Sequence, residues 1–169
     1  KQAQYITPSY MEAWYTLENG MMRATCRFVD YSGYPEATTT QELPAFYTVS
    51  GLSSFVFYDG TSPWSGDTLR YERDLPFWTT SSAYFGVKST ENWCAWVNDS
   101  GYGVGVFTPI AEILLAGRHQ YNGSYSPTSN ATNYVAPLIT YKMVSYNTFE
   151  YEYWITAGDI SDIRDTFSD

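Results

Sequence analysis

The clearest pattern in the chain is the alternation of apolar and polar residues in short runs. Residues 13–31 (AWYTLENGMMRATCRFVDY) contain two such runs around Glu18-Asn19-Gly20. Asn-Gly between alternating runs is the strongest short-range signal for a hairpin. The second arm has two unlike faces, as a sandwich strand with one buried face does. One face carries Met22, Ala24, Cys26 and Phe28, and the other carries Arg23, Thr25, Arg27 and Val29.

A second hairpin is predicted over residues 93–107 (WCAWVNDSGYGVGVF), with its turn at residues 98–101. In the return arm, Gly103 and Gly105 alternate with larger residues. Glycines on one face leave the backbone uncovered, which permits close approach by another strand, an aromatic ring or a ligand. Packing under a neighbouring tryptophan is the simplest of these explanations.

The remaining pattern indicates more short strands and one helix. Further apolar or alternating runs occupy residues 43–49, 52–58, 110–115, 134–144 and 149–156, and irregular polar loops are expected at 32–40, 59–78 and 117–133. At the tail, Asp159 is a candidate helix cap, and Ile160, Ile163 and Phe167 recur at helical spacing. About eight to ten strands without βαβ alternation predict an all-β fold, an antiparallel, jelly-roll-like β-sandwich with a short C-terminal helix. Residues 1–169 are expected to form one such domain.

Composition and charge restrict the setting and the partners. No apolar run approaches the ~18 residues of a membrane helix, so a soluble domain is expected. Residues 1–5 (KQAQY) lack the apolar stretch of a signal peptide. We therefore expect a piece of a larger secreted protein, in which any export signal has been removed or belongs to the larger parent chain. Eighteen acidic against nine basic residues give a net charge of −9, which disfavours nucleic acid and anionic membranes as partners.

Aromatic residues are the extreme of the composition. Seventeen Tyr, nine Phe and six Trp make up 19% of the chain. Their flat faces suit stacking on sugar rings, although Tyr is also a common strand residue. The aromatic loop at 59–78 and its surroundings supply the candidate ligand-binding residues Trp64, Tyr71, Trp78 and Tyr84. Pro63 and Gly66 predict that Trp64 lies at a turn tip, with the alternative that its ring folds back over the sheet.

Few residues offer catalytic chemistry or a cofactor site. The single histidine, His119, follows Arg118, and no triad, metal or phosphate-loop motif is present, so no cofactor is expected. A glycosidase needs only two carboxylates, and Glu42 and Glu91 are the candidates, with Asp99 a third acidic residue of interest. A lyase would need a base near Arg118 and His119.

The two cysteines leave two alternatives open. Cys26 and Cys94 both lie in predicted strands, 68 positions apart. They form either a disulfide or two buried free thiols.

Several stretches resemble β-sandwich modules of secreted bacterial polysaccharide-degrading proteins. They are QELPAFY at 41–47, ENW at 91–93 continuing to GYGVGVF at 101–107, YEYWI at 151–155 and DIR at 162–164. The resemblance implies a carbohydrate-binding module, or an ancillary sandwich domain of a larger carbohydrate-active enzyme, such as those of cellulosome-forming or gut bacteria. It identifies no ligand residues.

Together these observations predict a secreted, monomeric, noncatalytic domain that binds a polysaccharide or oligosaccharide and works beside other domains of a parent enzyme. A catalytic sandwich, either a glycoside hydrolase or a polysaccharide lyase, is the first alternative. A structural or adhesion spacer is the second.

Overall fold

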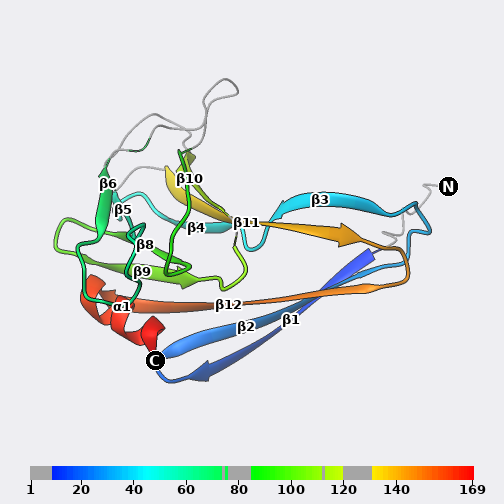
Figure 1. The fold of residues 1–169 in the computed structure, drawn as a ribbon, viewed down its shortest axis with the longest axis horizontal. Helices are drawn as coiled ribbons and strands as arrows, with labels where there is room; N and C mark the ends of the chain where they lie inside the picture. Colours follow the sequence, from blue (N-terminus) through cyan, green and yellow to red (C-terminus); the bar gives the residue numbers. More distant parts are fainter. Residues whose placement is uncertain (1–8, 74, 76–84, 112, 120–130) are drawn as a thin grey trace.

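A computed structural model describes residues 9–73, 75, 85–111, 113–119 and 131–169, which form two antiparallel sheets and one helix (Figure 1). The seven-stranded sheet has the order β1-β2-β12-β9-β8-β5-β6, and in the other sheet β4 pairs with β11 beside the order β3-β11-β10-β7. The strands are β1 (Ser9–Glu18), β2 (Met21–Asp30), β3 (Ala37–Glu42), β4 (Phe46–Val49), β5 (Ser54–Phe57), β6 (Arg70–Arg73), β7 (Phe85–Val87), β8 (Trp93–Val97), β9 (Tyr102–Phe107), β10 (Ile113–His119), β11 (Thr132–Met143) and β12 (Thr148–Asp159). The all-β sandwich is confirmed, with twelve strands in the described residues, slightly more than expected.

Both predicted hairpins are present. β1 and β2 pair from Ser9↔Asp30 to Glu18↔Met21, and Asn19 and Gly20 both have positive φ angles (48° and 77°). Two central residues with positive φ make the tight turn that matches the twist of the strands. β8 and β9 form the second hairpin, closed by the Asn98 side chain, which accepts hydrogen bonds from the Ser100 and Tyr102 N–H groups.

Three predicted loops contain strands. β3 begins at Ala37, inside the loop expected at 32–40, and β6 forms inside the loop expected at 59–78. β10 continues to His119, three residues into the loop expected at 117–133. These segments are rich in Thr, Tyr, charged residues or Gly, so they lack the apolar alternation by which strands are recognised in sequence. Their pairing comes from neighbouring strands instead, for example Ala37–Glu42 on β11.

The core has two layers, one on each side of the seven-stranded sheet. β8 is buried at every position because its two faces are both covered. Cys94 and Trp96 pack towards the five-stranded sheet, with Phe55, Phe57 and Val135. Trp93, Ala95 and Val97 pack on the opposite face against helix α1 (Ile160–Ser168).

Helix α1 confirms the prediction for the tail, although the Asp159 side chain makes no capping hydrogen bond. Ile163 and Phe167 are buried against the sheet. A Cβ atom at Gly105 would lie 2.5 Å from Ile163 and 2.8 Å from Phe167, so the glycine permits the helix to approach. At Gly103 a Cβ would collide with the Trp96 carbonyl of the paired strand. In the described part of the chain, no helix has the length and apolarity that crossing a membrane requires.

The two cysteines are free thiols. Both are buried, Cys26 in β2 and Cys94 in β8, and they belong to different core clusters. Burial raises the pKa of both thiols, which disfavours the reactive thiolate.

Substitution of Gly105 with alanine tests the packing of α1 on β9. We expect G105A to lower the free energy of unfolding by about 1–3 kcal/mol, because the added methyl group overpacks the contact with Ile163 and Phe167. Urea denaturation of the two proteins measures this difference. Gly86→Ala is the control, since its Cβ would meet only ordinary contacts at 3.6 Å or more. Equal stability of G105A and wild type would contradict the close packing of α1 on β9 at Gly105.

Candidate functional site

The loop between β5 and β6, residues 58–69, carries Trp64, which is the one of the two predicted ligand-binding tryptophans that the structure describes. Residues 61–68 are all exposed, and Trp64 itself is 41% exposed. Trp64 has a φ angle of 62°, a left-handed backbone conformation that is uncommon outside glycine. The predicted turn tip is therefore confirmed, and something must hold this backbone in place. We call residues 58–69 the Trp64 loop.

Tyr58 stabilises the Trp64 loop through its hydroxyl group. Its side chain is buried, and its hydroxyl lies 3.0 Å from the Ser62 carbonyl oxygen and 3.2 Å from the Asp67 carboxylate. The same hydroxyl accepts a hydrogen bond from the Ser62 N–H group at 3.2 Å. A Cβ atom on Gly60 would overlap the Tyr58 ring, so glycine is required where the chain folds over it. One phenol thus connects the two arms of the loop.

A buried ion pair anchors the loop to the rest of the fold. Glu91 is 1% exposed, and Arg164 of α1 donates to both of its carboxylate oxygens, from Nη2 at 2.6 Å and from Nε at 3.0 Å. The Trp64 N–H group donates to Glu91 Oε1 at 2.7 Å. The Trp93 indole N–H donates to Glu91 Oε2, also at 2.7 Å. Each carboxylate oxygen therefore accepts two hydrogen bonds.

Arg164 reaches the other arm of the loop as well. Its Nη1 donates to the Asp67 carbonyl oxygen at 2.6 Å, and its guanidinium carbon lies 4.9 Å from the centre of the Tyr58 ring. The Glu91–Arg164 pair is thus bonded to the backbone at the Trp64 tip and at Asp67 in the arm that follows it. None of these bonds involves the Trp64 ring.

The hydrogen bonds to Glu91 also decide its charge. Burial by itself raises the pKa of the Glu91 carboxyl, but the bonds from Arg164, the Trp64 N–H and Trp93 outweigh it, and the pKa lies below its ordinary value. The carboxylate is therefore ionised at neutral pH. Arg164 has a raised pKa because Glu91 bonds to it, so the pair stays charged on both sides.

Two of the four predicted ligand-binding residues can be placed. Trp64 lies at the tip of the loop, and Tyr71, 49% exposed, lies on β6, the strand that follows it. Trp78 and Tyr84 lie outside the described residues.

The residues considered for catalysis make structural contacts in different parts of the fold. Glu91 is 1% exposed, and both of its carboxylate oxygens accept the hydrogen bonds described above. Glu42 lies on β3, in the other sheet. Arg118 is fully buried and donates to the Ser53 carbonyl oxygen at 3.0 Å, instead of lying in a loop.

The other two catalytic candidates, His119 and Asp99, also contact other residues of the fold. The His119 ring packs near Tyr47 and Tyr134, with ring centres 5.7 and 5.2 Å away. Asp99, at the tip of the β8–β9 hairpin, pairs with Arg73 at 3.1 Å.

An aromatic and charged surface that the sequence did not single out covers the outer face of β1, β2 and β12. Arg27 stacks on Trp14 at 5.3 Å, and Arg23 stacks on Trp154 at 5.6 Å. Both arginines also pair with carboxylates of β12, Arg27 with Glu150 and Arg23 with Glu152. The hairpin pattern in the sequence placed Arg23 and Arg27 on one face, but their carboxylate partners on β12 are more than 120 residues away.

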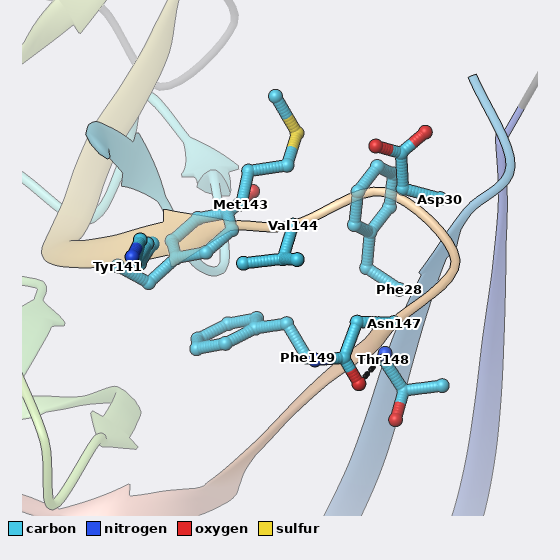
Figure 2. Close-up of a pocket in the computed structure, with 9 residues that line it drawn as sticks. Phe28, Asp30, Tyr141, Met143, Val144, Asn147, Thr148 and Phe149 are labelled. Carbon is cyan, nitrogen blue, oxygen red and sulfur yellow. Dashed lines mark hydrogen bonds between the residues drawn. The ribbon is translucent and has the colours of Figure 1, made fainter. Parts of the chain in front are cut away.

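A small cavity lies at the end of the molecule that carries the β11–β12 turn (Figure 2). It lies where β11 turns into β12 and is lined by the side chains of Phe28, Tyr141, Val144 and Phe149, among others. Its volume is about 20 Å³, which is enough for a single water molecule. The nearby Asp30 carboxylate accepts hydrogen bonds from the Ser32 N–H and hydroxyl groups, so it serves the local turn.

Comparison with known proteins adds no family. No protein-family model matches the chain, and no curated protein matches its sequence. The geometry of the chain's own residues is therefore the basis for a functional proposal.

Replacing Glu91 with glutamine tests the buried pair. We expect E91Q to lower the free energy of unfolding at pH 7 by about 3–5 kcal/mol, because Arg164 then lacks its counter-charge. The pKa of Glu91 is lowered by folding, so the pair stabilises the fold fully above the ordinary value of 4.5 and less as the pH falls through the folded-state value. The difference between wild type and E91Q in urea denaturation should therefore shrink below about pH 4.5.

Glu150→Gln is the matched control, because Glu150 also pairs with an arginine but on the exposed outer face. We expect E150Q to change stability little, since exposed ion pairs contribute little. A small effect of E91Q that does not depend on pH would show that the pair does not anchor the loop.

Proposed function

We propose that this domain binds carbohydrate without catalysing a reaction, and that the Trp64 ring is its principal contact. The observation that carries the proposal is an exposed indole on a turn whose backbone is fixed by Glu91, Arg164 and Tyr58. Stacking on a sugar ring needs an aromatic face held in place before the ligand arrives, because immobilising a flexible loop on binding costs affinity.

Polar groups around the tip suit a hydroxyl-rich ligand. Ser62, Ser65 and Asp67 are exposed beside Trp64, and they offer hydroxyl donors and carboxylate acceptors. The Ser65 hydroxyl donates to the Ser62 carbonyl oxygen at 2.6 Å, which leaves its oxygen able to accept a further bond. A sugar-binding surface combines an aromatic face with a few such polar groups. A secreted parent enzyme that carries this domain belongs to the same proposal.

A structural or adhesion spacer is the alternative that uses no small ligand. Aromatic rings packed under loops would favour it, whereas Trp14, Trp64 and Tyr71 are each more than 40% exposed. Titration calorimetry against soluble β-glucans, xylans, mannans and pectins distinguishes the two functions. Absence of binding to every plant and microbial glycan tested would reject the carbohydrate proposal.

Trp64→Ala is the direct test of the contact. Because the Trp64 backbone N–H, which the substitution keeps, bonds the loop to Glu91, W64A should keep the melting temperature close to that of wild type. By analogy with base stacking on aromatic side chains, we expect glycan affinity to fall by about 1–3 kcal/mol, or roughly ten- to a hundredfold. Calorimetry and thermal denaturation of the same variant measure both quantities.

Tyr146→Ala provides a closely matched control. Tyr146 is also an exposed aromatic residue with a left-handed backbone (φ 63°), and its N–H group is likewise bonded, to the Asp30 carbonyl oxygen at 2.7 Å. It lies in the β11–β12 turn, at the opposite end of the molecule from the β5–β6 loop (Figure 1). Y146A should leave affinity unchanged. A W64A protein that is destabilised but retains full affinity would mean that the ring is a core lid.

A further inference from the structure

A second surface cavity, of about 260 Å³, opens between the β1–β2 turn and the end of α1. The C-terminal end of α1 lies next to this turn in the fold (Figure 1). The lining residues are Glu18, Asn19, Met21, Phe107, Trp154, Phe167 and Asp169. The cavity shares no lining residue with the Trp64 loop. It is large enough for a small organic molecule or the end of a side chain.

Three aromatic rings from three elements form the walls. Phe107 of β9 lies between the other two, 5.6 Å from the Trp154 ring of β12 and 5.7 Å from the Phe167 ring of α1. Phe167 is buried in the core, and Phe107 and Trp154 pack against the same core cluster. The rings are therefore fixed by the fold. The turn is fixed as well, because the Thr156 hydroxyl donates to the Gly20 carbonyl oxygen at 3.0 Å.

The charges at the cavity are mostly negative. Glu18 and Asp169 contribute carboxylates to the lining. The nearby cation, Arg23, is neutralised by Glu152 at 2.6 Å and lies 3.7 Å from Glu18. Three carboxylates against one guanidinium leave an excess of negative charge. The Arg23 group also stacks on Trp154, so this indole already accepts a cation in the folded protein.

We propose that this cavity binds a quaternary ammonium group, such as the trimethylammonium end of choline. Aromatic faces attract cations through the ring quadrupole, and quaternary ammonium groups are the ligands for which aromatic cages are best suited. Rim carboxylates add a longer-range attraction, which the net charge of −9 reinforces. The proposal does not depend on carbohydrate binding at Trp64.

The chemistry of the lining favours this ligand over a sugar or a primary amine. Among the lining side chains, only the Asn19 amide and the Trp154 indole N–H are conventional hydrogen-bond donors, whereas a sugar's hydroxyl oxygens require several. A primary ammonium would lose bonds to water that rings and a thioether cannot replace, so that only the Glu18 and Asp169 carboxylates could accept from its N–H groups. A quaternary ammonium has no N–H groups to satisfy and carries the charge that the carboxylates favour.

Calorimetry with choline and its uncharged analogue 3,3-dimethylbutan-1-ol is the first test. The two molecules have nearly the same shape, so a difference in affinity reports the positive charge. We expect choline to bind and the alcohol to bind at least several-fold more weakly. Phosphocholine distinguishes the source of the group: weaker binding than choline indicates a free cation, and stronger binding indicates a phosphorylated headgroup, with the ammonium site supported in both cases.

Variants of the lining locate the binding. Trp154→Leu should weaken choline binding by about 2- to 30-fold, and Trp154→Phe, which keeps a ring, should restore part of the loss. Glu18→Gln should weaken it by about 2- to 5-fold. Glu12→Gln is the matched control, because Glu12 lies on the same strand and at a similar distance from an arginine (3.6 Å to Arg27) but outside the cavity. Thermal denaturation confirms that each variant is folded.

Three results would overturn the proposal. The first is no choline binding by the wild-type protein at millimolar concentrations. The second is equal affinity for choline and the uncharged alcohol, which would make the cavity merely apolar. The third is choline binding that persists unchanged in both W154L and E18Q, which would place the ligand elsewhere.

Discussion

The bidentate ion pair between Glu91 and Arg164 is the interaction on which the arrangement of this molecule depends. It joins residues 73 positions apart, with 10% or less of either side chain exposed. Through its hydrogen bonds it connects helix α1, the start of β8, and the tip and the following arm of the Trp64 loop. A buried charge without a partner is strongly destabilising, so the helix, the strand and the loop are held together as one unit. Gly105 makes this possible by letting α1 lie directly on β9.

This unit explains why the two ends of the seven-stranded sheet differ. Where α1 covers the sheet, β8 carries a continuous apolar run, because both of its faces are buried. Where the helix ends, the outer face of β2 and β12 carries Arg23, Arg27, Glu150 and Glu152, whose ion pairs remain partly exposed to water. The cavity lined by Trp154 lies at the boundary between these two regions. The part of the sheet covered by α1 supplies aromatic walls to this cavity, and the uncovered part supplies its charged rim.

The sequence predicted features that depend on neighbouring residues and failed on those that depend on distant ones. The Asn19-Gly20 turn and the apolar spacing of α1 are local signals, and both gave correct elements. Strand β6 and the end of β10 carry no local signal and form because a partner strand is in place. The site follows the same rule. Pro63 and Gly66 predicted the Trp64 turn. Glu91 was a catalytic candidate because the residues next to it in the sequence do not reveal its ion pair with Arg164, 73 positions away on α1.

A high aromatic content does not by itself indicate a binding surface. Many of the rings are structural: Tyr141, Phe149, Tyr151 and Tyr153 follow one another with centres 4.0–6.3 Å apart along the inner side of the sandwich. What distinguishes Trp64 is how it is attached. Its backbone is bonded to the buried pair while its ring is left partly exposed, so the groups that stabilise the loop and the group available for contact are separate. A side chain attached in this way can change with little effect on folding, which is the property that a residue selected for binding requires.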